Sequence, residues 1–187
     1  DYVNPLMGTD SDFSLSNGNT YPAIATPWAM NFWTPQTAKM GDGWAYKYDD
    51  KTIRGIKQTH QPSPWINDYA AFSLMAVTGN LKYKEEERAS YFSHKAEIVK
   101  PNHYSVYLAD YDVTAEVSPT ERAAHFKFTF PKTDSAFIIL DAFYKDYRYL
   151  LNSLYAPKIN SENFISSLIE FCEKLDKITN QKISHNF

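Results

Sequence analysis

The sequence has a single cysteine, Cys172, among its 187 residues. An intrachain disulfide is therefore excluded, as are a cysteine-rich zinc site and a Cys-x-x-Cys redox pair. No apolar run approaches the roughly 18 residues of a membrane-spanning helix. The net charge of −3 gives no basic surface for nucleic acid or anionic lipid. We therefore expect no nucleic-acid partner and no membrane span.

Several short motifs of catalysis and ligand binding are also missing. There is no Gly-x-Ser-x-Gly elbow, no His-Glu-x-x-His helix and no glycine-rich nucleotide loop. Residues 10–18 begin like an EF-hand loop, but Leu15 and Tyr21 stand where that loop needs glycine and glutamate. Asp1 is followed by neither the basic nor the apolar region of a signal peptide, so we expect none in this chain.

Glycine and tryptophan are confined to the first half of the chain. All six glycines and all four tryptophans precede residue 80, and this composition predicts turns and loops rather than long helices. Four later segments are rich in apolar and aromatic residues and short enough for strands: 103–111, 113–117, 125–130 and 136–140. Their spacing of about ten residues predicts a mainly β protein, an antiparallel β-sandwich.

The last part of the chain differs in texture, because its apolar residues recur with the period of a helix. The stripes that carry this period predict helices over 144–155 and 161–179. We therefore expect a β-sandwich over residues 1–143 and a helical tail over residues 144–187. The abrupt change after Phe143 is also typical of a fusion, truncation or frameshift junction.

Residues 28–69 contain the densest group of aromatic and short polar side chains. An aromatic ring packs well on the apolar face of a sugar, while hydroxyl groups need paired donors and acceptors. Trp65 follows two prolines that favour an extended loop, and His60, Asn67 and Asp68 flank it. Trp28 is open to two interpretations of equal weight, a core residue or a surface one.

Glycoside hydrolysis requires two carboxylic acids on either side of the scissile bond. The chain contains many carboxylates, but no spacing marks a pair of this kind. His60 and Asp68 lie eight residues apart on a segment interrupted by proline, so no helical or strand register aligns them as a catalytic or metal-binding pair.

Several separate segments resemble one known family. They are Val-Asn-Pro-Leu-Met-Gly-Thr at 3–9, Gly-Asn-Thr-Tyr-Pro at 18–22, Thr-Pro-Trp-Ala-Met-Asn-Phe-Trp-Thr-Pro at 26–35, Gly-Trp-Ala-Tyr-Lys-Tyr at 43–48, Ile-Arg-Gly at 53–55, the stretch 60–69, and 113–122. Over about residues 1–143 the chain resembles the N-terminal domain of glycoside hydrolase family 92. It departs from many members at Ala29 and Ala70, where glycine is common, which leaves the sugar linkage open.

The resemblance implies a calcium-dependent, inverting exo-α-mannosidase, from a largely bacterial and exported family that acts on mannose-rich glycans. It also implies that the catalytic acid and base and most calcium contacts lie on a helical barrel that follows the sandwich. We therefore expect no catalytic residue and no metal ligand in this chain. The positions expected to contact the sugar are Trp33, Trp44, His60, Trp65, Asn67 and Asp68.

Three hypotheses follow from these observations. The first is the N-terminal sandwich of a family 92 α-mannosidase, which supplies part of the sugar-binding cleft and is inactive without its partner, the missing catalytic barrel. The second is a stand-alone carbohydrate-binding module. The third is a marginally folded pseudogene product that exposes an aromatic patch.

Overall fold

The computed structural model describes residues 2–10, 20–38, 46–59, 72–142 and 154–155. The chain divides into two units, Asp1–Tyr155 and Ala156–Phe187, and all described residues belong to the first. Within them no helix has the length and apolar character needed to cross a membrane.

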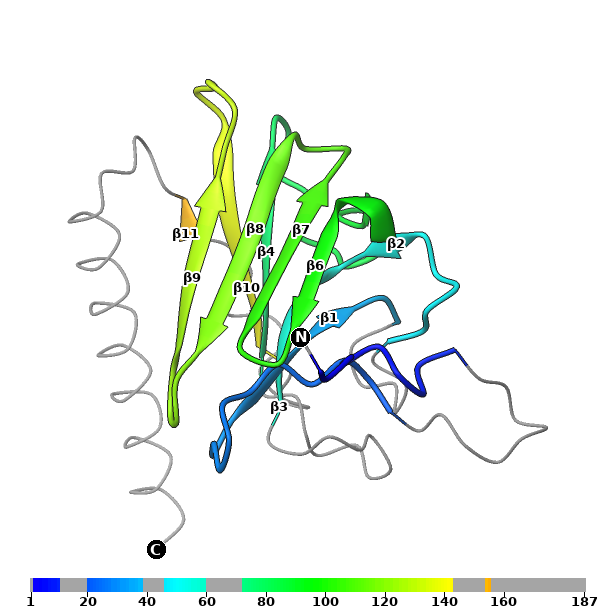
Figure 1. Ribbon diagram of the computed structural model, residues 1–187. Helices are drawn as coiled ribbons and strands as arrows, with labels where there is room; N and C mark the ends of the chain where they lie inside the picture. The colour runs from blue at the N-terminus through cyan, green and yellow to red at the C-terminus, as the bar shows by residue number, and fades with distance from the viewer. Residues whose placement is uncertain (1, 11–19, 39–45, 60–71, 143–153, 156–187) are drawn as a thin grey trace, which may run out of the picture. The chain divides into compact units, whose positions relative to one another are not determined.

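The described part of the chain consists almost entirely of antiparallel strands (Figure 1). One sheet has the order β1 (Phe32–Gln36), β3 (Gly55–Thr59), β4 (Phe72–Thr78), β10 (Ala136–Ala142), β11 (Leu154–Tyr155). A second sheet has the order β6 (Glu97–Lys100), β7 (His103–Leu108), β8 (Val113–Pro119), β9 (Ala124–Thr129). The short strands β2 (Thr52–Ile53) and β5 (Ser90–Tyr91) pair separately, and one 3-10 turn, η2, spans His94–Ala96.

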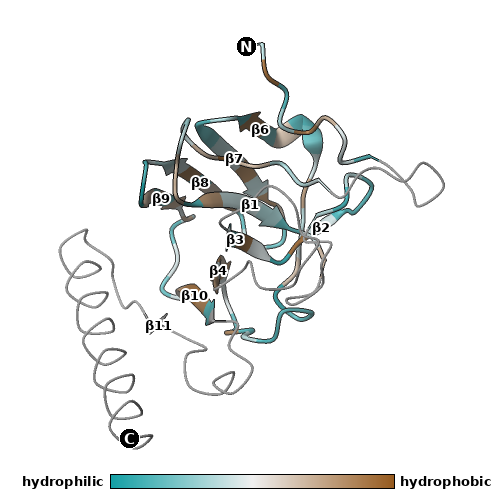
Figure 2. Ribbon diagram, turned by 90° about the horizontal axis from the view of Figure 1, so that it is seen from below, coloured by the Kyte–Doolittle hydropathy of each residue, from teal (hydrophilic) through white to brown (hydrophobic). Residues whose placement is uncertain are grey.

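The core lies between the two large sheets and follows the alternation of the sequence. In β8, Val113, Ala115 and Val117 are buried, while the residues between them are partly exposed. They join Met75 of β4 and Ile139 of β10 in one hydrophobic cluster. The hydropathy colouring in Figure 2 shows these apolar strand segments in brown. Because each strand turns one face inward, the predicted antiparallel β-sandwich is confirmed.

The strands expected from the later part of the sequence are present at β7, β8, β9 and β10. Strands β1, β3 and β4 were not individually predicted, and β3 shows why glycine is needed there. A Cβ atom on Gly55 would collide with the Ser73 hydroxyl and lie 3.0 Å from the Leu74 carbonyl oxygen. The glycine that suggested a turn therefore serves the close approach of two strands.

The prediction of a helix over 144–155 is wrong at its end. Leu154 and Tyr155 form β11, which pairs with Ile138 and Phe137 of β10. A strand edge that would otherwise lack partners gains hydrogen bonds from this pairing, which outweighs the local helical period. Residues 144–153 and the predicted helix 161–179 lie outside the described residues, so the helical tail and the domain boundary at 143 stay predictions.

Candidate functional site

One end of the sandwich contains Trp33 and the described residues that flank the predicted positions at 60–68 in the sequence. Strand β1 begins there and β3 ends there, because Phe32 pairs with Thr59. Strand β4 begins and β10 ends at the same side, because Phe72 pairs with Ala142. The hydroxyl groups of Tyr21 and Thr59 lie 3.0 Å apart and join the preceding segment to β3.

The loop before β1 crosses this end and is fixed to the second sheet at two points. The Ala25 amide donates to the Pro101 carbonyl at 2.7 Å, and the Met30 amide donates to the Glu121 carbonyl at 2.8 Å. Within the loop, the Ala29 amide donates to the Thr26 carbonyl at 3.1 Å. We call residues 25–30 the Trp28 loop. Its backbone is held by both neighbouring turns of the second sheet.

Trp33, one of the predicted sugar-contacting residues, lies in the core with 5% of its surface exposed. Its indole N–H donates to the Asn31 side-chain oxygen at 2.6 Å. Its ring meets Phe72 and Phe126 edge to face, with centroids 5.6 Å and 4.9 Å away. Trp33 therefore links the two sheets at this end, and its contact with sugar stays a prediction.

The other five predicted positions are Trp44, His60, Trp65, Asn67 and Asp68, and all lie outside the described residues. His60 directly follows Thr59, the last residue of β3, in the sequence. Only Trp33 of the six lies among the described residues, so their grouping stays a prediction. The structure does place Trp33 and the end of β3 at the same side of the first sheet.

A buried acidic group lies beside η2. The Glu97 side chain is 1% exposed, and its carboxylate lies 2.6 Å from Nδ1 of His94. The other imidazole nitrogen of His94 lies 2.9 Å from the Tyr48 carbonyl, and the two rings stack. Burial and the nearby Glu97 charge raise the pKa of both Tyr46 and Tyr104. The Glu97 carboxylate is enclosed and contacts His94, and His94 in turn contacts Tyr48.

A second buried charged residue, Arg88, lies in the segment before β5 and contacts the first sheet. Arg88 is fully buried, and its guanidinium contacts the Asp141 carboxylate of β10 at 2.7 Å. It also donates to the carbonyls of Arg54 and Tyr83, each at 2.9 Å. An ion pair with this many hydrogen bonds is a structural anchor, since every contact holds backbone or a neighbouring strand.

The described residues do not fit a calcium site. No three His, Cys, Asp or Glu side chains among them gather where they could hold a metal ion. The two acidic groups just described, Glu97 and Asp141, are each held by a basic side chain.

Sequence reasoning left Trp28 undecided, and the structure places it on the surface with 98% of its area exposed. Its backbone has a φ of +61°, in the left-handed region that a bulky side chain rarely adopts. No pattern in the sequence predicts a left-handed backbone conformation at this tryptophan. The proline before it and the short run of small residues around it are the only local hints.

The chain was compared with known families and solved structures. The glycosyl hydrolase family 92 N-terminal domain matches residues 2–166, beyond residue 143 where the resemblance above stops. A family GH92 inverting mannosidase from Bacteroides thetaiotaomicron VPI-5482 is 50% identical, with a TM-score of 0.69, over 75% of this chain and 19% of its own. No curated protein matches the chain significantly.

Two further solved structures agree. A family GH92 alpha-mannosidase from Bacteroides thetaiotaomicron is 36% identical, with a TM-score of 0.67, over 76% of this chain and 20% of its own. The same alpha-mannosidase has also been solved in complex with mannoimidazole. A gh92 family glycosyl hydrolase at 22% identity, with a TM-score of 0.62, shares the fold. The chain spans about a fifth of the length of these relatives.

Proposed function

This chain belongs to glycosyl hydrolase family 92 through its N-terminal domain, and we propose that it forms the β-sandwich side of the sugar-binding cleft of an α-mannosidase. The substrate class is the terminal α-mannosides of mannose-rich glycans. The chain by itself is inactive, because the groups that break the bond belong to the part of the family chain that follows this domain.

The observation that carries the proposal is the extent of the match. The family domain covers residues 2–166, yet the same chain covers only 19% of a 50% identical mannosidase. A glycosidase needs a positioned acid and a positioned base, and each such group contributes roughly 10²- to 10⁴-fold in rate. Among the described residues, the carboxylates of Glu97 and Asp141 are paired with His94 and Arg88.

In this proposal Trp44, His60, Trp65, Asn67 and Asp68 contact the sugar, the tryptophans through ring faces and the others through hydroxyl hydrogen bonds. Trp33 belongs to the same set, but its 5% exposure leaves little of the indole for a ligand. Its larger contribution is to hold the end of β1 against the second sheet. Calcium acts on the following domain, and export of the whole protein is part of the same proposal.

The first test is an activity assay on the chain alone. An aryl α-mannoside with calcium present is expected to show no hydrolysis above the buffer rate. The same assay without calcium and with a chelator provides the control. Clear calcium-dependent turnover by this chain would contradict the proposal.

A second test measures activity when this chain is joined to the rest of a family 92 mannosidase. The N-terminal domain of the 50% identical mannosidase is replaced by residues 2–166 of this chain, and hydrolysis of the same aryl mannoside is measured. We expect activity, and a Trp44→Ala change is expected to reduce kcat/KM by roughly ten- to a hundredfold through lost stacking. Tyr91→Ala is the matched control, since Tyr91 is an exposed aromatic of β5 outside the proposed site. Equal loss in both variants would count against a sugar contact at Trp44.

A stand-alone carbohydrate-binding module is the second candidate, favoured by the aromatic side chains and the short amide, carboxylate and imidazole side chains between them over residues 28–69. It predicts that the chain alone binds mannose or mannan and that Trp33→Ala or Trp44→Ala weakens this binding. Calorimetry that shows no heat with any mannoside removes this candidate and leaves the first intact.

A further inference from the structure

The outer face of the second sheet brings two histidines to either side of one serine. Ser118 of β8 pairs with His125 of β9, and its hydroxyl oxygen lies 3.1 Å from Nδ1 of His103 on β7. The strand neighbours Tyr104 and Val117 point into the core, with 0% and 1% of their surface exposed. Because side chains alternate between the two faces of a strand, His103 and Ser118 lie on the opposite, outward face. His125 is exposed on that same face.

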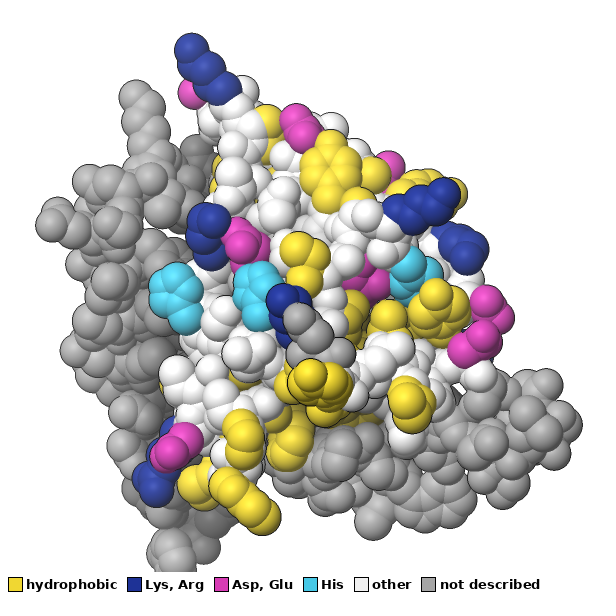
Figure 3. Space-filling view, in the orientation of Figure 1, with side chains coloured by type: hydrophobic (Ala, Val, Ile, Leu, Met, Phe, Trp, Pro, Cys, Tyr) yellow, Lys and Arg dark blue, Asp and Glu magenta, His cyan; other side chains and the backbone are white. Residues whose placement is uncertain are grey.

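The spacing of the strands suits one ion held between the two imidazole rings. Neighbouring strands lie roughly 4.8 Å apart, so with β8 between them the Cα atoms of His103 and His125 are roughly 10 Å apart. A metal–imidazole bond is about 2.0–2.1 Å long, and two imidazoles can meet one ion across this distance. Ser118 is small and leaves room between the rings. Figure 3 shows histidine side chains at the surface of this face of the molecule.

The contact with Ser118 prepares the His103 ring for a metal ion. When Nδ1–H of His103 donates to the Ser118 oxygen, the lone pair of Nε2 is left to bind a ligand. Histidines that bind metals characteristically engage their other ring nitrogen in such a hydrogen bond, which fixes the tautomer and orients the ring. His94 is the opposite case, because Glu97 and Tyr48 occupy both of its ring nitrogens.

The charged side chains beside this row decide how many protein ligands an ion finds. Glu116 of β8 is held by Lys127 of β9 at 2.7 Å, so its carboxylate is engaged. Lys100 of β6 pairs with His103, and its positive charge opposes a bound cation. Within the described residues no third His, Cys, Asp or Glu joins such a group. We therefore expect two imidazole ligands, water in the remaining positions and a moderate affinity.

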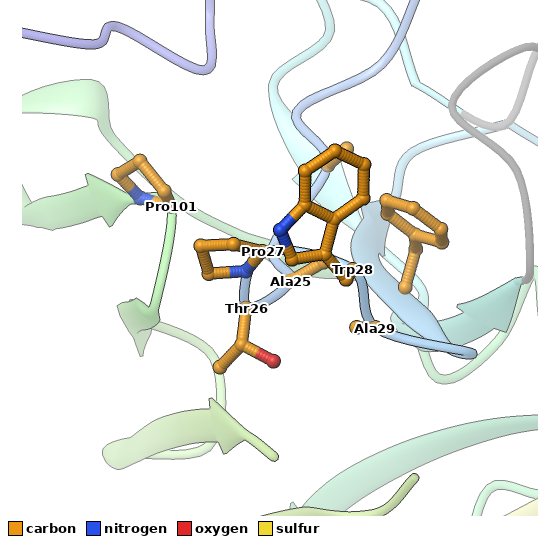
Figure 4. A pocket seen from close by; sticks show the side chains of 8 residues that line it. Ala25, Thr26, Pro27, Trp28, Ala29 and Pro101 are labelled. Atoms are coloured by element: carbon orange, nitrogen blue, oxygen red, sulfur yellow. The ribbon is translucent and has the colours of Figure 1, made fainter. Parts of the chain in front are cut away.

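The shallow hollow beside Trp28 offers no comparable ligands (Figure 4). Alanine, proline, threonine and two aromatic residues line it, and Figure 4 shows Pro27 beside the indole and Pro101 across the hollow. An ion of the zinc class needs nitrogen, sulfur or carboxylate ligands, which these side chains lack. The histidine row is therefore the better ligand site of the two.

We propose that His103 and His125 form a surface site for a divalent transition-metal ion of the class of Zn²⁺ and Ni²⁺, which imidazole ligands suit. The site adds metal ligands where the sequence predicted none. The bound ion ties β7 to β9 across β8 and stabilises the folded chain by mass action, because the unfolded chain does not hold the two rings together. The inference goes beyond the proposed function and does not depend on it.

The first test is calorimetry and thermal unfolding of the full chain with ZnCl₂, NiCl₂ and CaCl₂. We expect Zn²⁺ and Ni²⁺ to bind in the micromolar range and to raise the Tm by a few degrees, and Ca²⁺, which prefers oxygen ligands, to do neither. His103→Gln and His125→Gln are each expected to weaken Ni²⁺ binding roughly tenfold or more, since one imidazole remains. Thr129→Gln, at another exposed position of β9, is the matched control and keeps the affinity.

A second measurement needs no variant and covers one that fails to fold. Diethyl pyrocarbonate labels free imidazoles, and mass spectrometry reports each of the five histidines separately. Zn²⁺ is expected to slow the labelling of His103 and His125 together, at the concentration at which calorimetry shows binding, and to leave His94 unchanged.

Several outcomes would overturn the proposal. They are no binding of Zn²⁺ or Ni²⁺ up to millimolar concentration, equal affinity in the two histidine variants and the original chain, equal loss in Thr129→Gln, and binding of Ca²⁺ as tight as that of Zn²⁺. Zinc protection of histidines other than His103 and His125 would place the ion elsewhere and overturn it too. Hydrolysis of mannosides enters none of these measurements, so the proposed function is tested separately.

Discussion

Two tryptophans five residues apart have opposite environments. Trp33 on β1 is 5% exposed and packs between two phenylalanines, whereas Trp28 on the loop before it is 98% exposed. Both residues are tryptophans, and both lie in the segment 26–35. The difference is in the backbone, since β1 is extended and Trp28 is left-handed. The same residue type therefore lies in the core or at the surface depending on the backbone segment that carries it.

The comparison also distinguishes residues that stabilise the fold from an exposed residue that contributes little to its stability. The interior contains Trp33 and the Arg88–Asp141 pair, which hold the sandwich together, and the buried Tyr46 side chain. The Trp28 loop contributes little to that interior. We therefore expect changes in the interior to alter the free energy of unfolding and changes at Trp28 to leave it nearly unchanged.

The largest effect is expected from Trp33→Ala. Removing this ring leaves a cavity between Phe72 and Phe126 and frees the Asn31 side chain, at a cost of about 3–5 kcal/mol in the free energy of unfolding. Urea denaturation followed by circular dichroism gives the value. A loss below about 1 kcal/mol would show that Trp33 is not a core residue in solution, and the contrast with Trp28 would disappear.

Arg88→Met is expected to cost about 3 kcal/mol. The change leaves the Asp141 carboxylate without its cation and two backbone carbonyls without their donor, and an uncompensated buried charge is strongly destabilising. The matched control is Lys127→Met, which breaks the exposed pair with Glu116 and is expected to cost about 0–1 kcal/mol. Similar losses in both variants would mean that the interior pair is solvated.

Alkaline pH is expected to lower the free energy of unfolding through a buried tyrosine of the interior. Burial, and then the Glu97 charge, raise the pKa of Tyr46, so its hydroxyl stays neutral in the folded chain while the unfolded chain ionises near pH 10. The unfolded state then binds fewer protons, and stability that is complete below pH 10 falls by up to about 1.4 kcal/mol per pH unit above it.

Tyr46→Phe is expected to reduce this alkaline slope by about that amount, as measured by urea midpoints between pH 9 and pH 11. Part of the slope remains, because burial also raises the pKa of Tyr104. An unchanged slope in Tyr46→Phe would show that this hydroxyl is exposed to solvent.

The smallest effect is expected from Trp28→Ala in the chain alone. The side chain is 98% exposed, so its loss changes the free energy of unfolding by no more than about 0.5 kcal/mol. The same urea experiment measures it beside Trp33→Ala. A loss of several kcal/mol would place Trp28 inside the fold and contradict its contrast with Trp33.

The sequence predicted the second sheet better than the first. Strand β8 alternates strictly between buried and partly exposed residues, so its pattern can be recognised without a structure. Strand β3 is buried at four of its five residues and begins with a glycine, and neither feature distinguishes a strand from a turn. Leu154 fits a helical stripe but pairs in β11, because the open edge of β10 is invisible in a local pattern.

The family could be predicted from short segments between residues 3 and 122, and the family match over residues 2–166 confirms it. The carbohydrate contacts that aromatic and amide residues at 28–69 indicate stay a prediction. Trp33 shows the limit of that reasoning, since its place on β1 turns it toward the core. The role of the other five predicted residues stays a prediction.

By itself the sequence determined composition, the antiparallel β class and the family, because these depend on residue types and short-range alternation. Only the tertiary structure decided which tryptophan faces water, which arginine is buried and which residues close the sheet edge. The physical reason is that burial and backbone angle are set by contacts between segments distant in the chain, such as Met30 with Glu121 and Arg88 with Asp141.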